Sequence, residues 1–237
     1  MTKEDISINK PTTEDYLQWD IFVWSKALSL WSLVLEKKNI KNGLALEIGC
    51  KDGGLSLFLA NEFKFNILCS DLNGPTEKAN ELHKKFNTSN RINYIAADAI
   101  DLNFTDNSFD VVIFKSVLGS IGKNDNFENQ AKAITEIYRV LKPNGILLFA
   151  ENAKASFLHT FFRKIFRKWS SYWRYVTIEE MLKMLNIFKT IELRTAGIFS
   201  AFVTSKYLKK LIFPVDSFLE KVTPKNSHYV IYGYAIK

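Results

Sequence analysis

The chain has no apolar run of the roughly 20 residues that a membrane-spanning helix requires. It contains only 2 cysteines and 3 histidines in 237 residues. The histidines lie far apart in sequence, so no metal site is expected. Cys50 and Cys69 fall near the ends of two expected strands; a disulfide is geometrically conceivable, but cytosolic thiols more often stay reduced. The polar, acidic start of the chain is no secretory signal, and we expect a cytoplasmic protein.

What the chain does have is apolar content and positive charge. Hydrophobic residues make up 47% of it, enough to fill the core of one α/β domain. The formal net charge is +7. Such a charge suits nucleic acid, an anionic membrane surface or an acidic substrate. Composition favours the simpler explanation, a lysine-rich solvated surface.

Apolar segments of strand length alternate with amphipathic segments as far as residue 150. Side chains with helical periodicity cover residues 14–38, which predicts N-terminal helical structure. The expected strands lie at 44–48, 65–71, 92–97, 109–114 and 146–150. The expected helices between them lie at 54–63, 76–86 and 126–141. This alternation predicts a parallel sheet covered by helices on both faces.

The last third of the chain departs from that alternation. Residues 156–169 and 177–185 have helical periodicity, and Thr177 with Glu180 fits a capping box. The two remaining strands are expected at 188–195 and 229–236. A helical segment near 205–211 separates them, which permits an antiparallel closing pair.

The most informative segment reads GLALEIGCKDGG at residues 43–54, a buried strand that runs into a glycine turn and a helix start. The glycines let the backbone approach a ligand closely, and the helix N-terminus offers unpaired N–H groups. Asp71 ends the next strand, roughly 20 residues after the turn, where a carboxylate can accept both hydroxyls of a ribose. The pattern predicts a nucleoside site.

These motifs resemble the class I S-adenosylmethionine (SAM)-dependent methyltransferases, in the small-molecule branch, over roughly residues 40–151. That family ends its first strand in E/D-x-G-x-G-x-G; here the segment from Glu47 to Gly53 reads EIGCKDG, with Lys51 in place of the middle glycine. The resemblance implies that Asp71 holds the ribose and that Asp98 reads the adenine amino group. The cofactor-binding residues that it implies are Glu47, Gly49, Cys50, Lys51, Gly53, Asp71, Leu72, Asp98, Ala99 and Lys115.

The resemblance also implies the architecture: a Rossmann-like, doubly wound α/β sheet of seven strands, mostly parallel with an antiparallel last strand. We expect a single methyltransferase domain over 1–237. It divides into an N-terminal helical cap (1–40), a cofactor-binding core (41–151), a helical lid (152–186) and closing strands (187–237).

Two other functions fit parts of the pattern. A nicotinamide dehydrogenase uses G-x-G-x-x-G, but Lys51 would crowd the backbone where a pyrophosphate lies. The presence of Lys51 in the glycine pattern also motivates a second hypothesis, that the protein has the same fold and binds an adenosyl ligand without catalysing a reaction.

Methyl transfer from a sulfonium releases a neutral thioether, so the protein mainly has to position the nucleophile, which supplies on the order of 7–11 kcal/mol. A hydroxyl nucleophile also needs a proton acceptor. His159 is our preferred candidate, and Glu151 is the second, because both follow the fifth strand on the expected substrate side.

The methyl acceptor is the part of the function that the sequence determines least. The segment ENAKASFLH and the later WRYVTIEEM look similar to methyltransferases found with bacterial polysaccharide enzymes, which predicts O-methylation of a sugar or sugar carrier. A quinone or other lipid ring is the alternative. Nucleic acid is not expected as a partner, because Lys115-Ser-Val-Leu118 replaces the motif for amino-group methylation. The basic, aromatic segment 157–169 either covers the substrate or lies on an anionic membrane, peripherally at its inner face.

Overall fold

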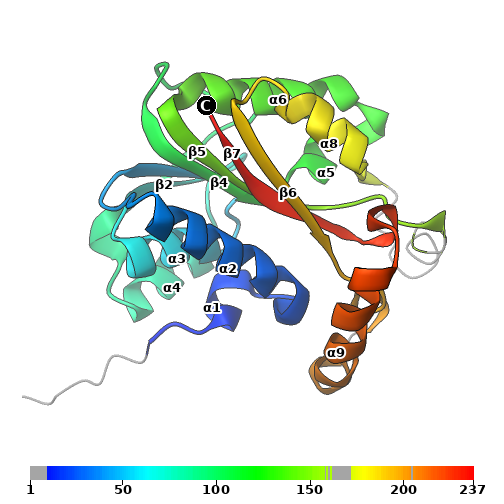
Figure 1. Ribbon diagram of the computed structural model, residues 1–237. Helices are drawn as coiled ribbons and strands as arrows, with labels where there is room; N and C mark the ends of the chain where they lie inside the picture. The colour runs from blue at the N-terminus through cyan, green and yellow to red at the C-terminus, as the bar shows by residue number, and fades with distance from the viewer. Residues whose placement is uncertain (1–9, 158, 160, 162–171, 204) are drawn as a thin grey trace, which may run out of the picture.

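The computed structural model describes residues 10–157, 159, 161, 172–203 and 205–237. Within them lies one sheet of seven strands in the order β3-β2-β1-β4-β5-β7-β6 (Figure 1). The strands are β1 (Leu44–Ile48), β2 (Asn66–Asp71), β3 (Ile92–Ala96), β4 (Phe109–Lys115), β5 (Leu141–Asn152), β6 (Thr190–Ala196) and β7 (Val230–Ile236). The helices are α1 (Thr13–Leu17), α2 (Ile21–Lys37), α3 (Gly54–Phe63), α4 (Glu77–Lys85), α5 (Leu118–Ile121), α6 (Phe127–Val140), α8 (Ile178–Leu185) and α9 (Lys206–Val222).

The sheet confirms the predicted Rossmann-like architecture. Strands β1 to β5 run parallel, and β7 runs antiparallel to its neighbours β5 and β6. The strand order reverses between β1 and β4. In such sheets the carboxyl ends of the strands at the reversal border a crevice where ligands bind. The glycine turn after β1 and the tip of β4 therefore lie at the expected ligand edge.

Helices cover both faces of the sheet because its central strands bury side chains on both sides. One core cluster includes Trp31 of α2, Leu57 of α3 and Ile113 of β4. The other includes Ile134 of α6 and Met181 of α8. Figure 1 shows α2, α3 and α4 on one side of the sheet and α6 and α8 on the other. Each such apolar side chain, when fully buried, stabilises the fold by about 1.5–3 kcal/mol.

The helical structure predicted over 14–38 is present, but as two helices rather than one continuous helix. The chain breaks into α1 and α2, with left-handed or related backbone at Gln18 (φ +66°) and Asp20 (φ +48°). Asp20 is buried, and it accepts hydrogen bonds from Lys209 (2.6 Å) and the hydroxyl of Tyr229. These distant partners hold the aspartate in place, so tertiary contacts override the helical periodicity of the segment.

Most other predicted elements differ only at their ends. The capping box at Thr177 and Glu180 is confirmed at the start of α8. The helix expected near 205–211 is longer than predicted, because α9 continues through Pro214 to Val222. Most of the helix expected over 156–169 lies outside the described residues.

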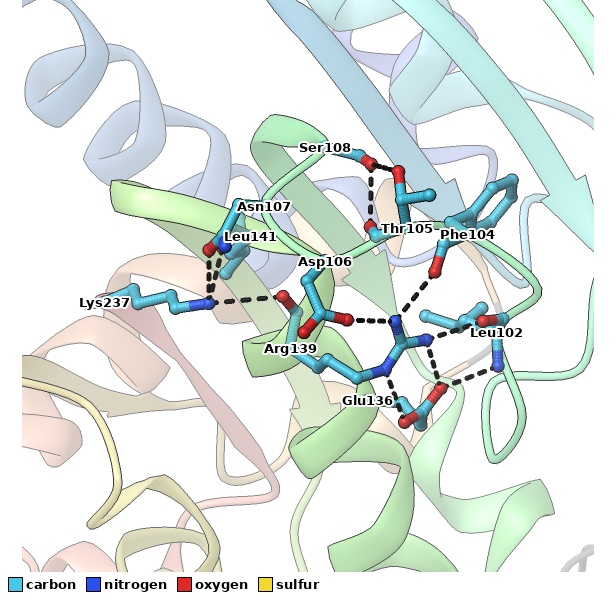
Figure 2. A network of polar contacts seen from close by, with 10 residues as sticks. All are labelled: Leu102, Phe104, Thr105, Asp106, Asn107, Ser108, Glu136, Arg139, Leu141 and Lys237. Atoms are coloured by element: carbon cyan, nitrogen blue, oxygen red, sulfur yellow. Dashed lines mark hydrogen bonds and ion pairs between the residues drawn. The ribbon is translucent and has the colours of Figure 1, made fainter.

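The loop from β3 to β4 is pinned by two residues of α6 (Figure 2). The Arg139 guanidinium donates to the carbonyl oxygens of Leu102 and Phe104, both at 2.7 Å, and to the Asp106 carboxylate. Glu136 accepts from the N–H of Leu102 at 2.9 Å. The nearby guanidinium of Arg139 lowers the pKa of Glu136. This network fixes the loop that carries Asp98, one of the predicted cofactor residues.

In the part of the chain that the structure describes, no helix combines the length and apolarity needed to cross a membrane.

Candidate active site

The turn between β1 and α3 adopts positive φ at alternate positions. φ is +65° at Gly49, +48° at Lys51 and +74° at Gly53. A Cβ added at Gly49 would lie 2.5 Å from Cγ2 of Val117, and one at Gly53 would lie 2.6 Å from Cε1 of His83. Both glycines are therefore required by conformation and by space. Lys51 adopts the middle left-handed conformation with a side chain in place, which costs roughly 1–2 kcal/mol.

Replacement of Lys51 by glycine should leave stability unchanged or raise it by up to about 1.6 kcal/mol. Glycine removes the left-handed strain of roughly 1–2 kcal/mol, while its freedom in the unfolded chain offsets about 0.4–1 kcal/mol of that gain. Urea denaturation measures the difference. Lys51→Val is the control, because it keeps the strain and adds a branched Cβ, so it should unfold more easily. A clear loss of stability in Lys51→Gly would show that the lysine side chain itself holds the turn.

Glu47 ties the end of β1 to the start of α3. Its Oε2 accepts hydrogen bonds from the backbone N–H of Ser56 (2.7 Å) and from the Ser56 hydroxyl. Burial raises the pKa of the Glu47 carboxyl to about 7, against the opposing effect of the Ser56 bonds. The carboxylate thus orients the helix N-terminus behind the glycine turn.

Asp71 and Asp98 lie at neighbouring strand tips, as the sequence predicts. Asp71 pairs with Ala96 across β2 and β3, and its carbonyl oxygen accepts from the N–H of Ala97. The Asp71 carboxylate accepts the N–H groups of Lys51 and Leu72, both at 2.9 Å. A carboxylate has about four acceptor positions, so this one retains capacity for two further hydroxyl donors.

The residues beside these aspartates differ in exposure. Asp98 is exposed, and its Oδ1 accepts the N–H of Ile100 at 3.1 Å. Leu72 is 61% exposed, whereas Ala99 is 7% exposed and belongs to a core cluster. An exposed leucine at this edge offers an apolar surface on which a ring can lie.

A cavity of about 1630 Å³ opens at the same edge of the sheet. A site for one drug-sized ligand takes roughly 300–1,000 Å³, so this cavity has room for two molecules side by side. Of the predicted site residues, the wall includes Glu47, Gly49, Cys50, Lys51, Lys115 and His159. The others, namely Gly53, Asp71, Leu72, Asp98, Ala99 and Glu151, are not part of that wall.

Lys115 is at the tip of β4, on the cavity wall. Its ammonium group donates to the carbonyl oxygen of Leu17 (3.2 Å) and lies over the rings of Trp19 and Trp24, at 4.3 and 5.0 Å from their centroids. Burial lowers the pKa of Lys115 to about 7, although Glu47 and other nearby carboxylates oppose the shift. A cation held this way ties the α1–α2 junction to the sheet edge.

The two predicted proton acceptors have different surroundings. His159 is on the cavity wall, 3% exposed. Its Nε2 is 2.6 Å from the carbonyl oxygen of Ile198, so Nε2 carries the proton and donates. Its Nδ1 is left as the acceptor, 2.9 Å from the Ser156 hydroxyl. Because Nδ1 is unprotonated in this arrangement, it is the atom able to take up a proton.

Glu151 is fully buried, behind the wall rather than on it. Its carboxylate accepts the N–H groups of Val117 (2.8 Å), Leu118 (2.6 Å) and Asn152 (2.8 Å). Burial raises the pKa of this carboxyl to about 7. Ser116, next to these amides, has φ +60°. The bonds of Glu151 therefore hold the turn that follows β4.

Sequence reasoning missed most of the far walls of the cavity. They come from residues 16–22, from Trp173 and Tyr175, and from the 198–203 segment with Lys206 and Lys209. Trp173 and Tyr175 belong to the segment WRYVTIEEM, which the sequence analysis had singled out. No motif marks the other residues, since they are separated by most of the chain. For them Asp20 was the available signal: a carboxylate inside an apolar periodic run requires buried partners or a break.

The sheet order, the glycine turn and the two acidic strand tips define the class: this is the fold of the class I SAM-dependent methyltransferases, whose cofactor is SAM. In agreement, residues 46–149 match the family model Methyltransf_11, described as a methyltransferase domain. The match covers a little under half of the chain, from β1 to β5.

Curated relatives are similar over the same region. A tocopherol O-methyltransferase of Arabidopsis thaliana is 29% identical over 114 residues, which cover 48% of this chain and 30% of that protein. A demethylmenaquinone methyltransferase of Leptospira interrogans is 35% identical over 138 residues, which cover 55% of this chain and 51% of that protein. The chain thus spans about half the length, or less, of these relatives.

Solved structures share the fold over more of the chain. Phosphoethanolamine N-methyltransferase 2 of Haemonchus contortus, in complex with phosphomonomethylethanolamine and S-adenosylhomocysteine, superposes with a TM-score of 0.61 at 19% identity. The superposition covers 90% of this chain and 52% of that one. At this identity the likeness concerns the fold alone.

Proposed function

We propose that this protein transfers the methyl group of SAM to a small-molecule acceptor that has an apolar, ring-bearing body. The observation that carries the proposal is the cavity of about 1630 Å³, which begins at the glycine turn and extends between aromatic side chains of three distant segments. Its volume suits the acceptor together with part of the cofactor, because Asp71, Leu72 and Asp98, which would hold the ribose and adenine, lie outside its wall. SAM, when bound, supplies an activated methyl group on a sulfonium.

The chain's own residues would hold the cofactor along the turn. Asp71 would accept the ribose hydroxyls, Leu72 and Asp98 would border the adenine, and Glu47 would keep the N-terminus of α3 in place. Enclosure between the turn and the aromatic walls would exclude water and bring the acceptor in line with the methyl carbon, the main source of rate in such transfers.

His159 remains our candidate proton acceptor. An acceptor hydroxyl at the Ser156 side of the cavity would pass its proton to Nδ1 of His159, directly or through the Ser156 hydroxyl, which is 2.9 Å away. Ile198 orients the ring through Nε2. For Glu151 the geometry favours a positioning role, because its oxygens are occupied by backbone N–H groups.

Two classes of acceptor remain. The sequence favours a sugar hydroxyl, on the likeness to polysaccharide-associated enzymes. The cavity favours the alternative, a quinone or other lipid ring, because Trp19, Phe199 and Phe202 lie on its walls. The names of the relatives also support a lipid ring, since one acts on tocopherol and another on demethylmenaquinone.

Calorimetry and a turnover assay on the full chain test the proposal in sequence. SAM and S-adenosylhomocysteine should both bind, and labelled SAM should then methylate prenylated hydroquinones in preference to nucleotide-linked deoxysugars. Turnover of the sugars alone would overturn the lipid-ring acceptor. Binding without turnover of either panel would support the non-catalytic alternative, and absence of binding would overturn the whole proposal.

A further inference from the structure

Helix α9 carries an apolar stripe on its outward face. The helix projects away from the sheet in Figure 1. Its exposed apolar side chains recur every three or four positions, which places them along one side of the helix. They are Tyr207 (70% exposed), Leu208 (49%), Leu211 (56%), Val215 (53%), Phe218 (64%) and Val222 (64%). Scattered exposed apolar residues are ordinary, but a continuous stripe marks an interaction surface.

The charges of α9 are sorted between its two faces. Its two carboxylates point inward: Asp216 accepts the N–H groups of Phe199 (2.9 Å) and Ser200 (3.0 Å), and Glu220 pairs with Lys26. The exposed lysines 210 and 221 fall together along one edge of the stripe when the helix is projected at 3.6 residues per turn, and Lys206, further round the helix, pairs with Glu14. The outward residues of α9 itself are therefore apolar or positively charged, and the one carboxylate beside them, Glu14, is paired with Lys206.

The stripe begins beside the mouth of the cavity. Lys206 and Lys209, at the start of α9, are on the cavity wall, as are Phe199 and Phe202 of the preceding segment. Phe199 is 49% exposed and Phe202 is 40% exposed. The bonds from Asp216 to this segment keep the helix and the mouth in one arrangement.

We propose that the outward face of α9 docks on an anionic lipid surface and places the cavity mouth against it. An apolar stripe edged by lysines is the pattern of helices that lie in a membrane interface, with the side chains between the acyl groups and the lysines near the phosphates. Charge argues against a second copy of this chain, since α9 turns both of its carboxylates inward and the neighbouring Glu14 is already paired with Lys206. The surface is independent of the proposed acceptor, and its test measures lipid binding without turnover.

Co-sedimentation of the full chain with vesicles tests the inference. One set of vesicles contains equal parts of phosphatidylcholine and phosphatidylglycerol, and the other contains phosphatidylcholine alone. The protein should bind the anionic vesicles, and added salt should weaken the binding. The double variant Leu211→Ser, Phe218→Ser should bind them at least about tenfold more weakly, since two apolar anchors are lost. Lys210→Glu with Lys221→Glu should remove the preference for anionic lipid.

A matched control separates this surface from exposed apolar residues in general. Leu33 on α2 is 59% exposed, so Leu33→Ser changes a comparable side chain elsewhere and should bind as the parent does. Because the variant positions are exposed, circular dichroism should report unchanged folding. Binding that survives both α9 variants would overturn the proposal and favour another surface, such as residues 157–169. Absence of vesicle binding, or self-association in ultracentrifugation that the Leu211 and Phe218 changes abolish, would also overturn it.

Discussion

Asp71→Ala should weaken SAM binding by about tenfold to a hundredfold. A hydrogen bond to a charged group contributes roughly 1.5–3 kcal/mol, and every 1.4 kcal/mol corresponds to about a factor of 10. The same carboxylate accepts the N–H groups of Lys51 and Leu72, so its removal also loosens the glycine turn. Calorimetric titration with SAM and S-adenosylhomocysteine measures the loss.

Two comparisons separate the contact to the ribose from the loosening of the turn. Asp101→Ala removes an exposed carboxylate nearby and should leave affinity unchanged. An S-adenosylhomocysteine analogue without ribose hydroxyls should bind the parent and the Asp71→Ala variant with more similar affinities than the natural ligand does. Equal affinity of the parent and Asp71→Ala for SAM itself would show that the ribose lies elsewhere.

Glu151→Leu should cause the largest loss of stability among these changes. It leaves the backbone N–H groups of Val117, Leu118 and Asn152 without their acceptor. Each unsatisfied buried donor costs about 1–3 kcal/mol, against a total stability of about 5–15 kcal/mol for a typical domain. Urea denaturation measures the effect, and an unchanged midpoint would contradict the role assigned to Glu151.

Glu151→Gln keeps one acceptor oxygen. It is the variant to measure if Glu151→Leu does not fold. The folded pKa of about 7 lies above the ordinary value of 4.5. The folded state therefore binds more protons than the unfolded state between these values, and this group's contribution to stability falls as pH rises from about 4.5 to 7. Glutamine does not titrate, so the stability of the variant should fall less between pH 4.5 and 7 than that of the parent. Glu47, whose pKa is also raised, accounts for the fall that remains. An identical pH profile would show that Glu151 titrates at its ordinary pKa.

The sequence alone was sufficient to predict those features that neighbouring residues determine. The glycine turn, the acidic tips of β2 and β3, and the alternation of strands and helices are each set by neighbouring residues, so the sheet and its ligand edge were predictable. The sequence also shows that Lys51 replaces the middle glycine of the family pattern, but it does not show the backbone conformation at that position. Only the backbone shows that the lysine adopts the left-handed conformation of the glycine it replaces.

The sequence by itself determined which fold this chain adopts and which strand ends meet at the edge where we propose the ligand, because those features follow from periodicity and from residue types at fixed spacing. The tertiary structure decided which distant residues contact these strand ends and the N-terminal helices. Asp20 breaks the first helix only because Lys209 and Tyr229 reach it from the far end of the chain. Glu151 accepts three backbone N–H groups, from Val117, Leu118 and Asn152, which its place after the fifth strand did not reveal. Such contacts join residues with no relation in sequence, so no local pattern carries them.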